Sequence, residues 1–250
     1  MKVTILQTDI QWGQPQQNIV RAERLMDTQP GSDLYVLPEM WATGFATTPM
    51  EVPLSDKPQQ WMQRMAVERQ CAISGSLAIK TPDGKYHNRH YFATPEGLTY
   101  YDKHHLFSYG HEDRYYTPGE QHVVVEYRGV RILLLTCYDL RFPVWSRYGL
   151  AGEYDVIVVV ANWPESRQQM WHILAKARAV ENQCYLVGVN RVGDDAFCHY
   201  IGESVVSNHR GDTLLQCETG KETAATVCLD MEKLEEARHR FRVLEDRDRW

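Results

Sequence analysis

The apolar residues of this chain fall into short runs of two kinds that alternate along the sequence. Runs such as 132–136 and 156–161 are apolar or β-branched throughout, a pattern typical of strands that are covered on both faces. Other stretches repeat apolar residues every three or four positions, as amphipathic helices do. The alternation predicts an α/β fold in which helices cover buried sheets.

The strand-like runs are separated by turn-forming residues. Strands are expected within residues 2–10, 33–39, 72–80, 86–97, 122–139, 154–162, 184–192, 203–217 and 224–230. Hairpin turns are expected at Pro82-Asp83-Gly84 and Arg128-Gly129, and a further turn at Arg210-Gly211-Asp212. Because fully apolar strands are mixed with alternating ones, the pattern predicts a mixed sheet or two stacked sheets.

Five segments have helical periodicity. They cover residues 15–31, 58–71, 144–153, 166–183 and 231–241. Apolar faces at helical spacing are formed by Ile19, Ala22, Leu25 and Met26 in the first segment and by Met170, Ile173, Leu174, Ala177 and Val180 in the fourth. Helices outside two stacked sheets would account for both strand types.

The chain shows no linker, low-complexity tract or internal repeat. Its 250 residues suit one α/β domain with a sizeable core. We expect residues 1–235 to form this domain. Residues 236–250 are expected to form a C-terminal helix or arm, which is a candidate for a subunit contact.

Composition and charge exclude some classes of partner. The net charge is −6 and no Lys/Arg-rich block is present, which argues against a nucleic-acid partner. No apolar run approaches the roughly 20 residues of a membrane helix. Six cysteines are spread along the chain without a Cys-x-x-Cys pair, which favours free thiols in a reducing compartment. We therefore expect a soluble, cytoplasmic protein that does not bind membranes.

Three chemically distinct side chains follow or end strand-like runs. Glu39 ends "DLYVLPE", Lys103 lies in "TYYDKHHLF", and Cys137 ends "RILLLTC". Each has an ordinary alternative: a capping or loop acid, a snorkelling surface lysine, and a core cysteine. Functional groups gather at the carboxyl ends of strands in open α/β sheets, however, so the three are candidates for one site.

Together these groups suit attack on an acyl group. A carboxylate can take the thiol proton, and a cation with a backbone N–H can stabilise an oxyanion. The residues after Cys137 are predicted to form a strand-to-helix elbow, where backbone N–H groups point at a thiolate or an oxyanion. Pattern and spacing alone leave this as one hypothesis beside the core cysteine.

The chain resembles the nitrilase, or carbon–nitrogen hydrolase, superfamily over about residues 2–235. "LPEMWATGF", "YDKHHLF" and "CYDLRFP" are similar to its glutamate, lysine and nucleophile motifs, and they occur in the family's order. The resemblance implies that Glu39 is the general base, Lys103 the oxyanion lysine and Cys137 the nucleophile. It also implies that Glu112, in "SYGHEDRYYTPG", orients the lysine, whereas the alternative is a solvated loop acid.

The same resemblance implies a fold and an assembly. The family fold is a four-layer α-β-β-α sandwich in one domain, and its members usually form homodimers or higher homo-oligomers in which sheets extend across subunits. No metal or organic cofactor is implied. His104, His105 and His111 lack a carboxylate or cysteine at ligand spacing, so we expect no metal there.

Among branches of the family, the motifs look closest to the ω-amidases. This implies hydrolysis of the side-chain amide of an α-keto acid such as 2-oxoglutaramate, with release of ammonia. Alternatives within the family are an aliphatic amidase, an N-carbamoyl hydrolase and a nitrilase. A catalytically retired scaffold and a thiol acyl transferase are the alternatives of a different class.

Candidate substrate-binding residues follow two strand ends. Tyr138 offers its backbone N–H, and Arg141 suits a bidentate carboxylate clamp, although pairing with Asp139 is the alternative. Asn162 and Trp163, in "VANWPESR", are candidates to line the pocket, with core packing the alternative for Trp163. Further clamp candidates are Arg167 and Arg191, whereas Cys184 and Cys228 are expected to be core residues.

Overall fold

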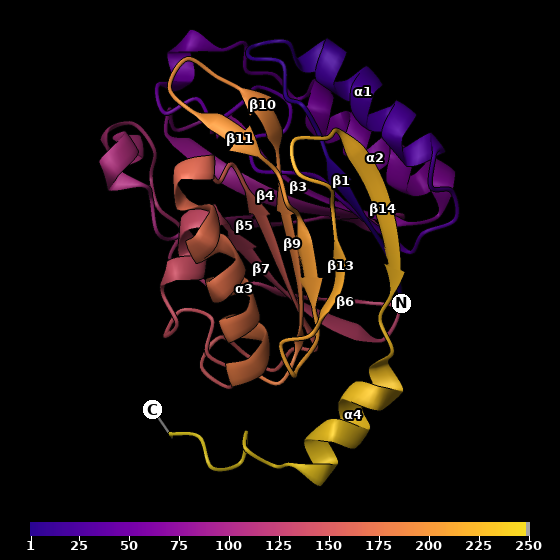
Figure 1. The fold of residues 1–250 in the computed structure, drawn as a ribbon. Helices are drawn as coiled ribbons and strands as arrows, with labels where there is room; N and C mark the ends of the chain where they lie inside the picture. Colours follow the sequence, from indigo (N-terminus) through magenta and orange to yellow (C-terminus); the bar gives the residue numbers. More distant parts are fainter. Residues whose placement is uncertain (249–250) are drawn as a thin grey trace.

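Two six-stranded sheets pack face to face in the computed structural model, which describes residues 1–248 (Figure 1). In spatial order, the first sheet contains β14 (Thr223–Cys228), β1 (Lys2–Gln7), β2 (Leu34–Val36), β3 (Ala72–Lys80), β4 (Tyr86–Thr94) and β5 (Gly97–Asp102). The second contains β13 (Thr213–Gln216), β12 (Val205–Ser207), β9 (Tyr185–Asn190), β8 (Val156–Ala161), β7 (Val130–Thr136) and β6 (Val124–Tyr127). A separate ribbon pairs β10 (Val192–Asp194) with β11 (His199–Ile201).

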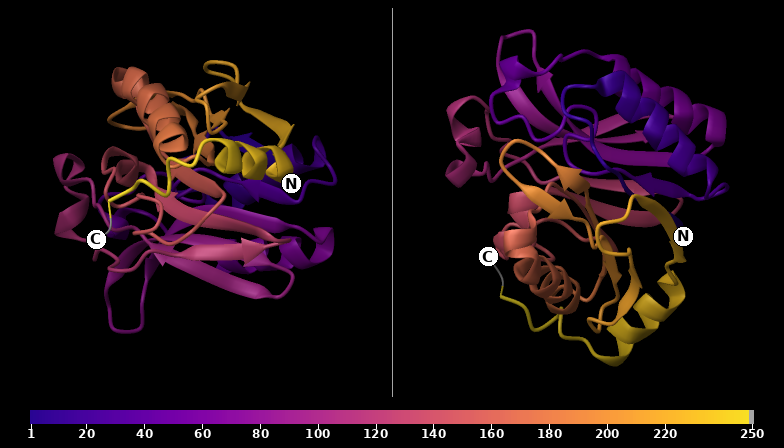
Figure 2. Two further views of the ribbon diagram at one scale, coloured as in Figure 1. Left: turned by 90° about the horizontal axis from the view of Figure 1, so that it is seen from below. Right: turned by 45° about the horizontal axis from the view of Figure 1, so that its top comes forward.

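Helices cover the outer faces of both sheets (Figure 2). Helices α1 (Pro15–Asp27) and α2 (Lys57–Arg69) pack on the first sheet, and α3 (Gln168–Glu181) packs on the second. Helix α4 (Met231–Arg240) follows β14. Short 3₁₀ helices are η1 (Pro49–Glu51), η2 (Ser108–Gly110), η3 (Glu112–Arg114), η4 (Cys137–Arg141) and η5 (Glu165–Arg167). The predicted four-layer α-β-β-α sandwich is confirmed.

The central strands, such as β8 and β9, are apolar on both faces because each face is covered. In β1, Val3 and Ile5 enter the core between the sheets, whereas Leu6 packs against the helices. In β8, Val158 faces the other sheet and Val159 faces the α3 side. Each fully buried Val, Leu or Ile contributes roughly 1.5–3 kcal/mol. A slip of one residue would exchange the side chains that face the two layers, so close packing on both faces fixes the strand register.

Both sheets are mixed, and their parallel parts place several strand ends together. β1, β2 and β3 are parallel neighbours in the first sheet, and β7, β8 and β9 are parallel in the second. The predicted hairpins β3–β4 and β6–β7 are antiparallel and confirmed. The turn predicted at residues 210–212 joins β12 and β13, which are also antiparallel. The loops after β2, β7 and β8, together with the segment after β5, carry the candidate site.

One predicted helix is absent, and the buried face predicted for another is wrong. Residues 144–153 form turns, in which Gly149 and Gly152 adopt left-handed φ angles of +92° and +98°. Helix α3 forms as expected, but the predicted apolar face is largely on the outside: Met170, Ile173 and Val180 are 42%, 58% and 44% exposed.

The buried face of α3 is built from other residues. Trp171, Ala175 and Ala179 face the second sheet. A Cβ atom added to Gly188 of β9 would lie 2.9 Å from the Trp171 ring, so glycine is what lets helix and strand approach this closely. Small residues on both elements therefore decide which face of the helix is buried.

The cysteines are free, and their burial differs from one expectation. Cys184 is fully buried as predicted. Cys228 is exposed, and the prediction that it is a core residue is wrong. It is the last residue of β14, an edge strand of the first sheet, where less of the strand is covered.

The C-terminal segment continues from the main fold without a break. Helix α4 crosses the predicted boundary between residues 235 and 236. Arg238 donates to Asp155 over 2.8 Å, and Leu244 packs in the core on the α3 side. Residues 249–250 of the predicted arm lie outside the described residues, and a subunit contact there stays a prediction. Within residues 1–248, no helix has the length and apolar character required to cross a membrane.

Candidate active site

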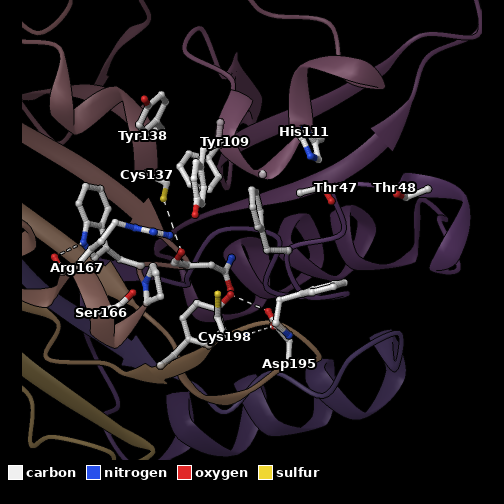
Figure 3. Close-up of a pocket in the computed structure, with 18 of the residues that line it drawn as sticks. Thr47, Thr48, Tyr109, His111, Cys137, Tyr138, Ser166, Arg167, Asp195 and Cys198 are labelled. Atoms are coloured by element: carbon white, nitrogen blue, oxygen red, sulfur yellow. Dashed lines mark hydrogen bonds between the residues drawn. The ribbon is translucent and has the colours of Figure 1, made fainter.

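A cavity of about 640 Å³ lies where loops from both sheets meet, with Cys137 in its wall (Figure 3). All five residues proposed from the two strand-end motifs line it, namely Cys137, Tyr138, Arg141, Asn162 and Trp163. Aromatic side chains form much of the remaining wall, including Phe45, Phe107, Tyr109, Phe197 and Tyr200. A cavity of this size suits a small molecule.

Cys137 lies at the predicted elbow between β7 and η4. Its φ angle is +45°, a left-handed conformation that a non-glycine residue adopts only when its surroundings enforce it. The Asp139 carboxylate accepts the Thr136 N–H over 3.0 Å, which closes the first turn of η4. The Cys137 thiol lies 3.9 Å from the carbonyl oxygen of Asn162.

Asp139 also joins the cysteine loop to the segment that carries Lys103. The buried carboxylate accepts from the Tyr101 hydroxyl at 2.8 Å and from both the backbone N–H and Nδ1 of His105 at 2.9 Å. Within residues 1–248 it forms no ion pair with Arg141, whose guanidinium instead lies 5.0 Å from the Trp163 ring centre. The alternative Asp139–Arg141 pair is therefore wrong.

Glu39 lies three residues beyond β2, between Pro38 and Met40, and is fully buried. Met40 has a φ angle of +43°, so this loop too contains a left-handed residue. The Glu39 carboxylate accepts from Lys103 Nζ at 2.8 Å and from the Asn162 N–H at 3.0 Å. Asn162 also donates its side-chain amide to the Glu39 carbonyl oxygen at 2.6 Å.

Lys103 and Glu112 complete this buried cluster. Both side chains are fully buried, and Lys103 Nζ lies 2.9 Å from Glu112 Oε2. Glu112 also accepts from the Phe107 N–H at 2.7 Å. The alternatives of a surface lysine and a solvated loop acid are thus wrong.

Asn88, in β4, belongs to the cluster although the sequence reasoning missed it. Its side-chain NH₂ group donates to Glu39 at 2.8 Å and to Glu112 at 3.0 Å. The feature of the sequence that could have identified Asn88 is the alternation along β4. It places Asn88 and His90 on the same face as Phe92, a residue of the core between the sheets. Polar groups on such a face must find buried partners.

The surroundings set the charge of each group. Burial raises the pKa of the Cys137 thiol well above its usual value, and the Glu39 carboxylate adds to this while Lys103 opposes it. Burial alone would lower the pKa of Lys103, but Glu112 and Glu39 outweigh it and raise the pKa. Burial also raises the pKa of Glu112, with Lys103 opposing and Glu39 adding. At neutral pH Cys137 is therefore a thiol and Lys103 an ammonium ion.

The other two arginine candidates, Arg167 and Arg191, differ in whether they reach the cavity. Arg167 lines the cavity, with its guanidinium 5.3 Å from the Phe107 ring centre. Arg191 is fully buried and donates to the carbonyl oxygens of Ile10 and Val192. Arg191 is thus occupied within the fold, whereas Arg141 and Arg167 both reach the cavity.

The histidines near Lys103 have other contacts. His104 stacks on Trp145 with ring centres 3.6 Å apart, and His105 binds Asp139. His111 lines the cavity. Across residues 1–248, no group of three or more His, Cys, Asp or Glu side chains is arranged to hold a metal ion. A thiol, a carboxylate and a buried ammonium group in one cluster are the parts needed for covalent acyl chemistry.

The sequence of this chain is similar to proteins of known family. Residues 2–239 match the model of the carbon–nitrogen hydrolase family. The omega-amidase YafV of Yersinia enterocolitica is 41% identical over 253 residues, covering 100% of this chain and 98% of the relative. The 2-oxoglutaramate amidase of Bacillus subtilis is 33% identical over 257 residues, covering 98% of both chains.

Solved structures agree with this similarity. XC1258 of Xanthomonas campestris, a CN-hydrolase superfamily protein with an arsenic adduct in its active site, superposes with a TM-score of 0.95 at 34% identity, over 100% of this chain and 98% of its own. Nit3 of Saccharomyces cerevisiae has a TM-score of 0.86 at 24% identity, over 96% of this chain and 94% of its own. The second similarity concerns the fold alone.

Proposed function

This chain belongs to the carbon–nitrogen hydrolase family, and from that premise we propose that it is an ω-amidase, an enzyme that hydrolyses the terminal carboxamide of an α-keto acid. 2-Oxoglutaramate is the model substrate, and ammonia and the dicarboxylic keto acid are the products. The relatives named as omega-amidase and 2-oxoglutaramate amidase, which align along nearly the whole chain, support this substrate class.

The observation that carries the proposal is the position of Glu39. Its carboxylate is held by Lys103 and by the Asn162 N–H, beside the Cys137 thiol. A buried carboxylate next to a thiol whose pKa is raised is suited to take the thiol proton at the moment of attack.

The first half of the reaction transfers the acyl group to sulfur. Glu39 takes the proton of Cys137, and the thiolate attacks the carboxamide carbon. Lys103 and the backbone N–H of Tyr138 stabilise the oxyanion of the tetrahedral intermediate. The protonated Glu39 then gives its proton to the leaving nitrogen, so that ammonia departs and a thioester remains.

The second half releases the acid. Glu39 takes a proton from water, whose oxygen attacks the thioester carbon. Collapse of the second tetrahedral intermediate breaks the carbon–sulfur bond, and Glu39 returns the proton to Cys137. Glu112 holds Lys103 in place during both halves through their 2.9 Å contact.

Recognition of an α-keto acid monoamide requires a partner for its carboxylate. Arg141 and Arg167 both line the cavity, where their guanidinium groups lie against the aromatic rings of Trp163 and Phe107. We assign Arg141 as the carboxylate anchor because it follows Cys137 by only four residues. Asn162 and Trp163 form the adjoining wall.

A panel of substrates tests this proposal. Ammonia release is measured from 2-oxoglutaramate, glutamine, a simple aliphatic amide, a nitrile and an N-carbamoyl amine, with Cys137→Ala as the matched control. We expect release to be fastest from 2-oxoglutaramate and absent in the variant. Faster turnover of a nitrile or N-carbamoyl amine would instead assign the chain to another branch, and release by Cys137→Ala at the wild-type rate would refute the mechanism.

We propose further that the protein acts in the cytoplasm as a homodimer. The exposed apolar residues Met170, Ile173 and Val180 of α3 form a stripe that a second copy would cover, and the six free cysteines suit a reducing compartment. Light scattering after size exclusion tests the assembly. Ile173→Glu should yield monomers, while Lys176→Glu, at a charged position on the same helix, serves as a control. A monomeric wild-type protein would contradict the proposed dimer.

A further inference from the structure

Asn88 provides a neutral donor to both buried carboxylates of the site. Its NH₂ group lies 2.8 Å from Glu39 Oε1 and 3.0 Å from Glu112 Oε1. Lys103 Nζ bridges the same two acids, at 2.8 Å and 2.9 Å. Two carboxylates are thus held by one positive donor and one uncharged donor.

The orientation of the Asn88 amide is fixed from the opposite side. The Ser76 hydroxyl donates to Asn88 Oδ1 at 2.8 Å and accepts the Met40 N–H at 2.9 Å. A flipped amide would turn its oxygen toward both carboxylates and lose the bond from Ser76. Since Met40 directly follows Glu39, this chain of hydrogen bonds returns to the loop that carries Glu39.

Asn88 also holds the backbone of the lysine segment. Its carbonyl oxygen accepts the Lys103 N–H over 2.9 Å. The residue is only 1% exposed, and the cavity lining does not include it within the described residues. Its contacts therefore involve the proposed catalytic groups and not the substrate.

The charges of the cluster explain why a neutral donor matters. Two carboxylates and one ammonium group leave one excess negative charge in a fully buried site. Hydrogen bonds donated to a carboxylate favour its ionised form, whereas burial and a neighbouring carboxylate favour protonation. The titratable groups that face Glu39 are Lys103, Glu112, Cys137 and Tyr116. Asn88 therefore supplies a donor to the excess negative charge that Lys103 alone does not balance.

We propose that Asn88 is a positioning residue that holds the Glu39 carboxylate directed at Cys137. The inference rests on the proposed function, in which Glu39 is the base. It predicts that replacing Asn88 shifts the pH dependence of Cys137 reactivity, with little effect on substrate affinity. A purely structural role would lower the amount of folded protein and leave the pH profile unchanged.

The test measures alkylation of Cys137 by iodoacetamide as a function of pH, with the modified cysteine identified by peptide mass spectrometry. Iodoacetamide carries a carboxamide group and requires the same proton transfer to Glu39. Asn88→Asp places a third carboxyl group against the other two, so the acid limb of the profile should move to higher pH by about one unit or more. Asn88→Ala removes the donor without adding charge and should move the limb in the same direction.

Turnover of 2-oxoglutaramate provides the second readout. We expect kcat of Asn88→Ala to fall about tenfold to a hundredfold, with KM nearly unchanged, because misplacing a catalytic group costs rate more than affinity. Asn182→Ala is the matched control. Asn182 is equally buried, accepts the Tyr148 N–H and donates to Arg178, but lies outside the cluster.

The outcomes distinguish the role of Asn88 from the proposed amidase function. If both Asn88 variants keep the wild-type alkylation profile, or if Asn182→Ala shifts it equally, the role of Asn88 is refuted. If the wild-type protein releases no ammonia from any amide, the proposed function fails, while the alkylation profile still decides the role of Asn88. Thermal denaturation identifies a variant that does not fold, and Asn88→Ala then decides the matter in place of Asn88→Asp.

Discussion

Removing the charge of Lys103 should lower both the stability of the protein and its rate of catalysis. The two effects can be measured separately. In Lys103→Met the side chain keeps a similar length and apolar body but loses its ammonium group. Wild-type Nζ lies 2.8 Å from a Glu39 oxygen and 2.9 Å from a Glu112 oxygen, so the substitution removes two close ion pairs. The two carboxylates would then share a fully buried site with no cation.

The expected magnitude follows from these ion pairs. Breaking a buried ion pair by removing one partner costs about 3–5 kcal/mol, because an uncompensated charge remains. For a chain of this size each kcal/mol lowers the melting temperature by about 2–4 °C, so a decrease of about 6–20 °C is expected. Loss of the proposed oxyanion donor should reduce kcat by about 100- to 1,000-fold.

The stability loss should depend on pH. Burial already raises the pKa of Glu112, and Lys103, which opposes that increase, is absent from the variant. A carboxyl group with a raised pKa binds more protons in the folded state than in the unfolded state between its two pKa values. Stability therefore falls as pH rises above the ordinary glutamate pKa of about 4.3. The difference in melting temperature from wild type should be larger at pH 8 than at pH 5.

A double variant separates charge balance from catalysis. Lys103→Met combined with Glu112→Gln removes one cation and one anion, so part of the lost melting temperature should return. Ammonia release should stay at least about 100-fold reduced, because the oxyanion donor is still missing. Calorimetry and an ammonia assay measure the two effects. Wild-type stability of Lys103→Met at pH 8, or recovery of activity in the double variant, would refute this reasoning.

Three further predictions concern the pocket, the loop contacts and the thiols. Arg141→Met should raise KM for 2-oxoglutaramate about 10- to 100-fold, as expected for the loss of hydrogen bonds to a carboxylate, and leave Cys137 alkylation by neutral iodoacetamide unchanged; an unchanged KM would reassign the anchor. Asp139→Asn should lower the free energy of unfolding by about 1–3 kcal/mol in chemical denaturation, because its carboxylate accepts from Thr136, Tyr101 and His105; unchanged stability would contradict the role of Asp139 in joining these loops. A disulfide reagent at pH 8 should modify Cys228 in the native protein before Cys71, since Cys228 is exposed and burial raises the pKa of Cys71 to about 11; the reverse order in a timed mass-spectrometric assay would be inconsistent with the structure.

The fold was predictable because burial acts on short segments. Strands covered on both faces, such as β8, read as continuous apolar runs, and the hairpin turns contain the glycines that such turns require. Helix α3 shows where this reasoning ends. Periodicity identifies an apolar stripe, but it does not reveal that Trp171 and two alanines face the sheet while Ile173 faces outward.

The candidate site was predictable in part because its main residues lie in short motifs near strand ends. Glu39, Lys103 and Cys137 each lie in a recognisable motif near a strand end, and the structure brings them and their loops together. Asn88 has no motif, because an asparagine in a hairpin strand is equally compatible with the solvent-facing side. Its role depends on partners 24 and 49 residues away, whose positions arise only after both sheets have formed.

The site is divided between the two sheets, and this makes function depend on their docking. Glu39, Asn88 and Lys103 belong to the first sheet and its loops, whereas Cys137 and Asn162 belong to the second. Ser74 of β3 donates to the buried His90 of β4 over 2.7 Å within the first sheet, and His90 donates across to the Leu135 carbonyl of β7 over 3.1 Å, close to Cys137. A loosened, molten intermediate that keeps its strands but separates its layers would have no active site. Enzymatic activity therefore monitors tertiary assembly, and it should disappear on heating before the secondary structure measured by circular dichroism does.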